Sequence, residues 1–158
     1  MAGDEQAFLK SAVSLKNGEL MITNGLSWAS IRPLIAPSVW AKTNGKCYYC
    51  GEKLADIFDV EHLIPQSRGG SHALKNLVPS CKPCNREKGA KSLEDWRDYK
   101  HMLVACRDYR LPSFNARQVA WLRSQGFEPY ATVPKPVFWF ERALEAQNDN
   151  TPLAAQVA

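Results

Sequence analysis

The chain has 158 residues, 45% of them hydrophobic, so it can bury one real core but is short for two full domains. Lysine and arginine total 20 against 16 acidic residues, and the formal net charge of +4 gives only a mild bias towards anionic partners. The N-terminus lacks a signal-peptide pattern and no apolar run reaches membrane-spanning length, so we expect a cytoplasmic protein with no membrane association.

The first half of the chain predicts two helices followed by a strand region. Spaced apolar residues indicate a short helix within 1–16 and a second within about 26–42, which Pro33 or Pro37 is expected to interrupt. From residue 54 to 64, apolar and β-branched residues favour two short strands or one bent strand.

The second half predicts three helices. Ser92 has the character of an N-cap, because Asp95 follows three residues later and apolar residues then recur at helical spacing. A second helix is expected over 115–125 and a last one over 137–146. Residues 147–158 are polar and alanine-rich without periodicity, so we expect a disordered tail.

Four of the five cysteines form two pairs with metal-ligand spacing, Cys47-x2-Cys50 and Cys81-x2-Cys84. Each pair can place two thiolates on one side of a tight turn, as a tetrahedral Zn²⁺ ion requires. A site of four thiolates is closed, so this zinc would be structural. Four unrelated buried thiols or two disulfides are the alternatives, which the paired spacing and a reducing compartment disfavour. Cys106 has no such partner and is expected to be a small buried hydrophobic residue.

Between and after the cysteine pairs, polar residues recur in a fixed order. The motifs in this order are Glu61-His62, Pro65, Gly69-Gly70, Asn76-Leu77 and Cys84-Asn85 with Lys88. Together with the cysteines they resemble the HNH nuclease family over residues 47–89, less than a third of the chain.

This resemblance implies an α+β fold: a small ββα-metal core, stapled by the four-cysteine zinc site and flanked by N- and C-terminal helices. The corresponding boundaries are 1–44 for an N-terminal helical segment, 45–91 for the nuclease core, 92–146 for a C-terminal helical extension and 147–158 for the tail.

The resemblance also implies hydrolysis of DNA phosphodiester bonds. His62 would be the general base that takes a proton from the attacking water, and Asn76 would brace the loop that orients His62. Glu61 and Asn85 match the ligands of one divalent ion, and oxygen ligands suit Mg²⁺ or Mn²⁺ better than a second Zn²⁺. Because adjacent residues in a regular strand point to opposite faces, Glu61 and His62 can serve one site only if the strand bends.

Five basic residues near these motifs are candidate contacts to DNA phosphates: Arg68, Lys82, Arg86, Lys88 and Lys91. A solvated basic face is the alternative for each of them. His72 and His101 match no catalytic position and are expected to be solvated or capping residues.

Three classes of function remain open from the sequence. An endonuclease for double-stranded DNA is favoured, because a module that needs only the zinc scaffold has no use for Glu61, His62, Asn76 and Asn85 together. The alternatives are a non-catalytic zinc-stapled domain that binds DNA or a protein, and a nuclease specific for RNA or for a branched structure. Sequence specificity, oligomeric state and biological role stay open.

Overall fold

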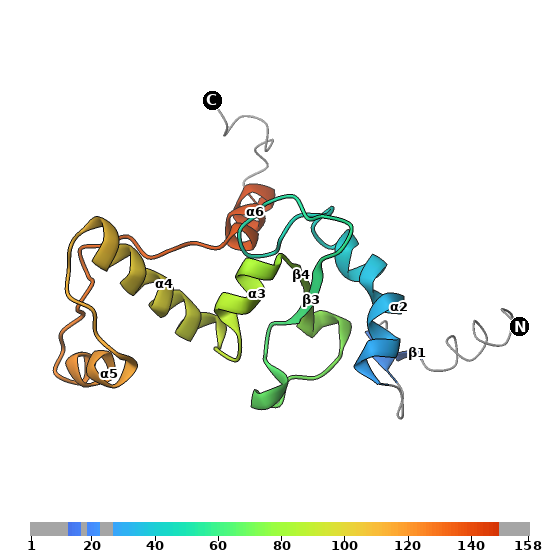
Figure 1. The fold of residues 1–158 in the computed structure, drawn as a ribbon, viewed down its shortest axis with the longest axis horizontal. Helices are drawn as coiled ribbons and strands as arrows, with labels where there is room; N and C mark the ends of the chain where they lie inside the picture. Colours follow the sequence, from blue (N-terminus) through green and yellow to red (C-terminus); the bar gives the residue numbers. More distant parts are fainter. Residues whose placement is uncertain (1–12, 17–18, 23–26, 149–158) are drawn as a thin grey trace, which may run out of the picture. The chain divides into compact units, whose positions relative to one another are not determined.

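The protein forms two compact units that contain different secondary structure. The computed structural model describes residues 13–16, 19–22 and 27–148 (Figure 1). One unit comprises the described residues up to 90 together with residues 138–148, and the other comprises residues 91–137. The described strands belong to the first unit and both units contain helices, so the predicted α+β class is confirmed.

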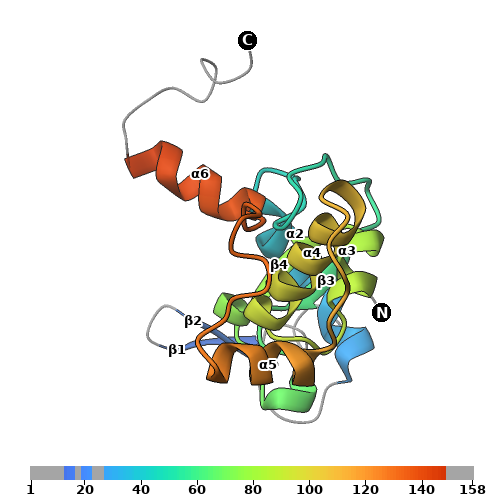
Figure 2. The same cartoon turned by 90° about the vertical axis from the view of Figure 1, so that its left-hand side faces the viewer.

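The chain's first described element is a hairpin. Strand β1 (Val13–Lys16) pairs antiparallel with β2 (Glu19–Ile22), with Val13 opposite Ile22, and Figure 2 shows the two strands side by side. The helix predicted within 1–16 is therefore wrong for 13–16, and its residues 1–12 lie outside the described residues. Over four residues, Val-Ser-Leu-Lys alternates apolar and polar side chains, a pattern that fits a strand as well as part of a helix.

Helix α2 (Trp28–Ala41) confirms the second predicted helix. Its buried side chains are spaced by four residues and are Ile31, Ile35 and Val39. The predicted interruption is wrong, because α2 continues through Pro33 and Pro37. Both prolines are exposed, so the carbonyl groups that lose a backbone donor can be hydrated and the helix continues.

The centre of the first unit is a ββα arrangement. Strand β3 (Asp59–His62) pairs antiparallel with β4 (Leu77–Ser80), and helix α3 (Lys82–Lys88) follows at once (Figure 1). The pairing of β3 with β4 is regular, so residues 54–64 contain one short unbent strand. Two 3₁₀ turns, η1 (Gln66–Arg68) and η2 (Leu74–Asn76), shape the loop between the strands.

The C-terminal segment of the first unit binds to the turn that carries the first cysteine pair. The Trp139 amide donates to the Tyr49 carbonyl at 2.8 Å, and the Phe140 ring stacks on Tyr48 with centroids 4.3 Å apart. Helix α6 (Trp139–Asn148) begins here, two residues later than predicted, and it includes the first two residues of the predicted tail. The rest of that tail lies outside the described residues.

The second unit confirms two predicted helices and the predicted cap at Ser92. In α4 (Leu93–Asp108) the Ser92 hydroxyl accepts from the Asp95 amide at 3.1 Å, and the Asp95 carboxylate accepts from the Ser92 amide. Helix α5 (Ala116–Ser124) is capped in the same way by Asn115. In each cap, the N-cap side chain accepts from the backbone amide of the third helical residue, and the side chain of that residue accepts from the N-cap amide. The two residue types recur at a fixed spacing, so such caps can be recognised in a sequence.

Two residues of α4 differ from expectation. His101 is buried rather than solvated, and its Nε2 lies 2.8 Å from the Val133 carbonyl oxygen, which makes it a satisfied core residue. Cys106 is only half-buried, and the neighbouring Ala105 is the residue that enters the core.

None of the helices that the structure describes is long and apolar enough to cross a membrane.

Replacing Ile35 by alanine should lower the free energy of unfolding by about 2 to 4 kcal/mol, because its fully buried side chain would leave a cavity under α2. Urea denaturation at saturating zinc measures the change. The exposed Ser38 of the same helix provides the control, and Ser38→Ala should change stability by no more than about 0.5 kcal/mol. Equal effects of the two substitutions would contradict the assigned buried face.

Candidate active site and metal centre

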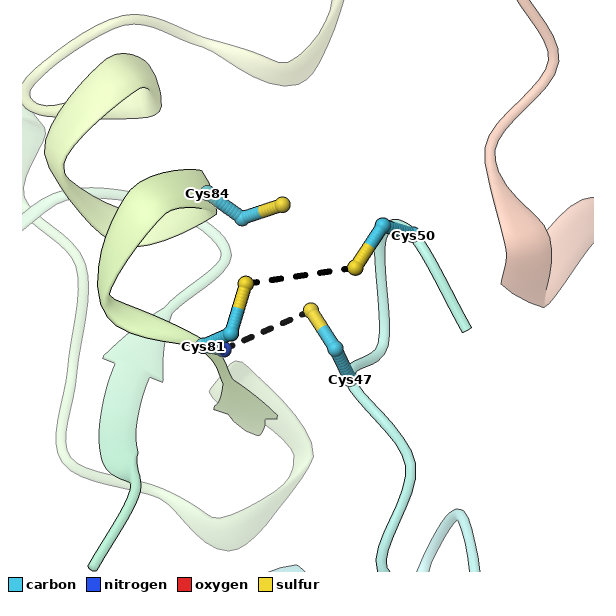
Figure 3. Close-up of side chains that lie close together, drawn as sticks. All are labelled: Cys47, Cys50, Cys81 and Cys84. Carbon is cyan, nitrogen blue, oxygen red and sulfur yellow. Dashed lines mark hydrogen bonds between the residues drawn. The ribbon is translucent and has the colours of Figure 1, made fainter. Parts of the chain in front are cut away.

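The two cysteine pairs converge on one point. The four sulfur atoms of Cys47, Cys50, Cys81 and Cys84 lie within 4.8 Å of one another (Figure 3). Cys50 Sγ and Cys81 Sγ are 3.9 Å apart, too far for a disulfide. Four sulfurs at about 2.3 Å from a tetrahedral zinc would be about 3.8 Å from each other, so the cluster fits a zinc ion.

Backbone geometry sets both halves of this cluster. The first pair lies on a turn closed by the Gly51 amide, which donates to the Cys47 carbonyl at 2.9 Å. Gly51 has a φ of +81°, and a Cβ there would collide with the Trp139 ring, so this position requires glycine. Cys81 immediately precedes α3 and Cys84 lies in its first turn, and the Cys81 amide donates to Cys47 Sγ at 3.4 Å.

The protonation of the thiols also favours a cation. A hydrogen bond from Cys84 lowers the pKa of Cys47 to about 4, whereas donating that hydrogen bond raises the pKa of Cys84 far above its usual range. Burial raises the pKa of Cys50 to about 11. The Cys47 thiolate therefore forms readily, whereas ionisation of Cys50 and Cys84 is opposed and would be favoured by the positive charge of a bound metal.

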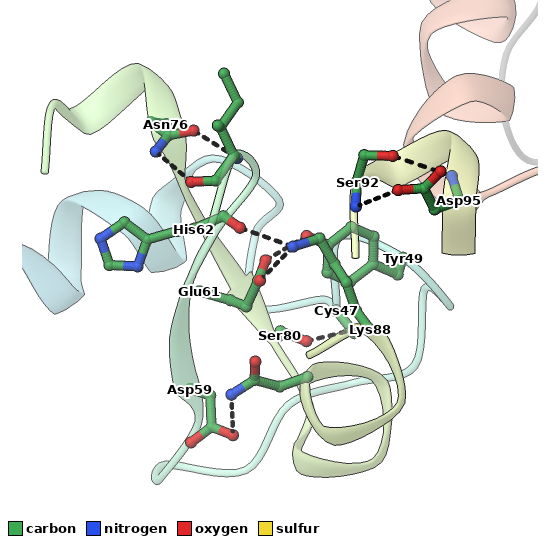
Figure 4. A network of polar contacts seen from close by, with 12 residues as sticks. Cys47, Tyr49, Asp59, Glu61, His62, Asn76, Ser80, Lys88, Ser92 and Asp95 are labelled. Atoms are coloured by element: carbon green, nitrogen blue, oxygen red, sulfur yellow. Dashed lines mark hydrogen bonds and ion pairs between the residues drawn. The ribbon is translucent and has the colours of Figure 1, made fainter. Parts of the chain in front are cut away.

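His62 lies at the end of β3 and faces away from Glu61, as Figure 4 shows. The Trp28 ring contacts the imidazole with centroids 5.0 Å apart, and His62 Nε2 is 3.0 Å from His72 Nδ1. Burial, with smaller electrostatic contributions from His72 and Lys88, lowers the pKa of His62 to about 4. The imidazole is therefore neutral at neutral pH, the form that can accept a proton.

Asn76 joins the two ends of the loop that follows β3. Its Oδ1 accepts from the Ile64 amide at 2.8 Å, and its Nδ2 donates to the carbonyls of Ile64 and Ser71 at 3.0 and 2.8 Å. The loop passes so close that a Cβ on Gly70 would lie 1.7 Å from the Ile64 carbonyl oxygen. The buried amide thus fixes the segment that begins one residue after His62.

Glu61 lies on the opposite face of β3, inside the protein. Its carboxylate accepts from the Lys88 ammonium at 2.6 Å and from the Tyr49 hydroxyl. Lys88 is 0% exposed and also donates to the His62 carbonyl at 2.9 Å. Burial raises the pKa of Glu61, and the hydrogen bonds from Lys88 and Tyr49 offset part of that rise. The predicted contact of Lys88 with DNA is corrected, since its ammonium is enclosed by these partners.

Asn85, the other predicted metal ligand, forms its side-chain hydrogen bond with Asp59 and not with Glu61. Its Nδ2 donates to Asp59 Oδ2 at 3.0 Å, so its Oδ1 remains available for other partners. Asp59 and Glu61 are two positions apart in β3 and therefore face the same side, towards α3. The structure thus presents two carboxylates and one amide between β3 and α3.

The remaining predicted DNA contacts occupy different environments. Arg68, Lys82 and Arg86 are exposed. Lys91 belongs to the second unit, and its ammonium lies over the Tyr99 ring at 5.1 Å from the centroid.

Sequence reasoning missed three side chains of this region: Tyr49, Asp59 and His72. Tyr49 lies between the first two cysteines, and Asp59 has no motif of its own. His72 had a usable signal, because it lies in the loop that follows His62 and two residues after Gly70, which helps to close that loop.

The comparisons with known proteins agree on one family. Residues 47–99 match the family model described as HNH endonuclease. The chain is 35% identical over 63 residues to the Septu protein PtuB of Bacillus thuringiensis, covering 37% of this chain and 24% of that protein. It is 32% identical over 65 residues to YoqL of Bacillus subtilis strain 168, covering 34% of this chain and 27% of that protein. YoqL is an SPbeta prophage-derived protein named as a candidate HNH endonuclease.

The matched region thus spans about a quarter of the length of each of these relatives. The segment that the family model matches holds the cysteine cluster and the ββα arrangement. The segment from residue 47 to residue 99 therefore belongs to the HNH endonuclease family.

Proposed function

We propose that the protein is a metal-dependent endonuclease that hydrolyses phosphodiester bonds in double-stranded DNA. The observation that carries this proposal is the placement of His62, a neutral imidazole at the end of β3 whose following loop is held by Asn76. A fixed, neutral imidazole is what a general base for water requires. Family membership of residues 47–99 supports the same chemistry.

In this proposal His62 takes one proton from water as the water oxygen attacks the scissile phosphorus. Asn76 acts as a positioning residue, because it holds the backbone after His62 and does not itself reach the reacting atoms. Since His62 is the last residue of β3, a phosphate placed at this strand end can be reached from both faces of the strand.

Glu61 and Asn85 are the proposed ligands of a divalent ion, Mg²⁺ or Mn²⁺. The donor chemistry fits such an ion, because the carboxylate of Glu61 and the amide oxygen of Asn85, which Asn85 does not use in its hydrogen bond to Asp59, are oxygen ligands on neighbouring elements. When bound, the ion would stabilise charge on the phosphate and on the leaving oxygen. The Lys88 ammonium is a competing cation for Glu61, so Glu61 must share or exchange this partner in order to bind the ion.

Exposed basic residues supply the proposed contacts to the DNA backbone. Lys82 and Arg86 are four residues apart in α3 and therefore lie on one side of that helix. Arg68 is exposed on the loop after β3. Contacts of this kind position a duplex without reading its sequence.

A second candidate function is a non-catalytic zinc-stapled domain that binds DNA. The ion pair between Glu61 and Lys88 favours it, because that pair satisfies the carboxylate without any divalent ion. The two functions differ in one outcome, which is cleavage.

His62→Ala should reduce cleavage of supercoiled plasmid by at least about 100-fold in Mg²⁺ or Mn²⁺, because the general base is lost. Conversion to open-circle and linear forms is followed on gels, with EDTA and added zinc as further conditions. Ser67→Ala, an exposed change in the same loop, serves as the control and should cleave normally. Full activity of His62→Ala would rule out the proposed base.

Wild-type protein that binds the plasmid but cuts it in no metal would favour the non-catalytic alternative. Matched RNA, single-stranded and branched substrates in the same assay separate DNA duplex cleavage from an RNA-specific or structure-specific nuclease.

Glu61→Gln should weaken Mn²⁺ binding by more than about tenfold, because a carboxylate ligand is lost. Electron paramagnetic resonance of free Mn²⁺ measures this binding. Asp59→Asn is the matched control: it also removes one carboxylate from the same face of β3, yet an amide oxygen can still accept from Asn85, so its effect should be small. The reverse order of effects would move the metal ligand from Glu61 to Asp59.

Purified protein should contain one zinc per chain, and replacing Cys81 by serine should remove it and destabilise the first unit. Metal analysis and thermal unfolding followed by circular dichroism measure the two effects. Cys106→Ser is the control, since Cys106 lies outside the cluster, and it should retain zinc. Zinc bound equally well by the Cys81 variant would contradict the proposed site.

A further inference from the structure

His72 is the least expected residue near His62, and the surrounding contacts hold it firmly. Its ring stacks on Trp28, with centroids 4.7 Å apart and planes at 17°. Its Nδ1 lies 3.0 Å from His62 Nε2, and its Nε2 lies 2.9 Å from the side-chain nitrogen Nε2 of Gln66. The three side chains therefore form a chain of hydrogen bonds that begins at His62 and ends at the surface, where Gln66 is exposed.

The same amide fixes both histidines. Asn76 bonds to Ile64, two residues after His62, and to the carbonyl of Ser71, the residue before His72. One buried side chain thus sets the distance between the two rings. Because Asn76 holds the backbone near each histidine, the contact between the two rings is a fixed feature of the fold.

The hydrogen-bond chain has two states, because each neutral imidazole carries one N–H group and one lone pair. In the first state Gln66 donates to His72, and His72 Nδ1–H donates to His62 Nε2. The remaining proton of His62 is then on Nδ1, so neither ring nitrogen of His62 has a lone pair for the proton of water.

In the second state every donor is reversed. His62 Nε2–H donates to His72 Nδ1, and His72 Nε2–H donates to the amide oxygen of Gln66. Only a half-turn of the Gln66 amide is needed, and the exposed side chain is free to make it. The lone pair on His62 Nδ1 is now open, and this nitrogen makes no hydrogen bond to another residue that the structure describes.

We infer that His72 is the positioning residue of His62: by accepting the Nε2–H of His62, with Gln66 behind it, His72 leaves Nδ1 as the nitrogen that takes the proton. This inference rests on the proposed function for its consequence in catalysis, but the choice of tautomer is a property of the protein alone. When His62 has gained the proton, both of its nitrogens carry hydrogen, and His72 Nδ1 continues to accept one of them.

Two substitutions of His72 test the stacked ring and the hydrogen-bond acceptor separately. His72→Phe keeps an aromatic ring to stack on Trp28 but has no acceptor. His72→Asn loses the ring but can place its amide oxygen near the position of Nδ1. We expect His72→Phe to lower kcat by between about 10- and 100-fold, with KM changed less than about twofold, as for other residues that orient a functional histidine. His72→Asn should restore most of kcat.

Nitrogen-15 NMR of the His62 ring provides a readout that does not depend on cleavage. In the wild type the spectrum should show the Nε2–H tautomer of His62 as the main form. In His72→Phe the two tautomers should become mixed, and His72→Asn should recover the wild-type pattern. Zinc content reports whether each variant keeps its fold.

An unchanged His62 tautomer in His72→Phe would overturn the inference. If the wild type cleaves DNA, an unchanged kcat in His72→Phe would overturn it as well. If the wild type cleaves nothing, the proposed function fails by itself, and the NMR measurement still decides whether His72 sets the tautomer of His62.

Discussion

Convergence of four sulfur atoms on one point is the constraint on which the first unit depends. The ββα arrangement has two four-residue strands and a seven-residue helix, too few residues to bury a large core. The cysteine cluster joins the turn at 47–50 to the start of α3, and the segment at 139–140 bonds to the same turn. A metal bound at this point would compensate for the small apolar core, as in other small metal-stapled domains.

Polar contacts then position the remaining site within this frame. The buried amide of Asn76 holds the loop after β3, and the buried Lys88 ammonium joins α3 to both Glu61 and the His62 carbonyl. These groups are surrounded by protein, where hydrogen bonds are strong and unpaired groups are costly. Among the described side chains, no buried polar atom lacks a partner. The satisfied polar groups therefore favour one arrangement of the site, in addition to the apolar packing of α2 against the two strands.

Features with local causes could be predicted from the sequence, and those with distant causes could not. Paired cysteines indicated the metal cluster, and Ser92 with Asp95 indicated a helix start, since each pattern lies within a few residues. The Glu61–Lys88 ion pair joins residues 27 positions apart, and the return of residues 139–140 to the cysteine turn spans most of the chain. The strand at Val13–Lys16 was missed because four alternating residues do not distinguish strand from helix.

The two faces of β3 divide the site into two parts: Glu61 with Lys88 on one face, and His62 on the other. Glu61 is neutralised by Lys88, so the protein carries no bare buried carboxylate when a divalent ion is absent. The fold therefore does not need that ion, whereas ionisation of Cys84 and Cys50 is opposed and would be favoured by a bound metal. His62, on the other face, is governed by the aromatic and histidine side chains around it. Because β3 is regular, the two parts meet only at its end, and this strand end is where a substrate phosphate must lie if both are to act on it.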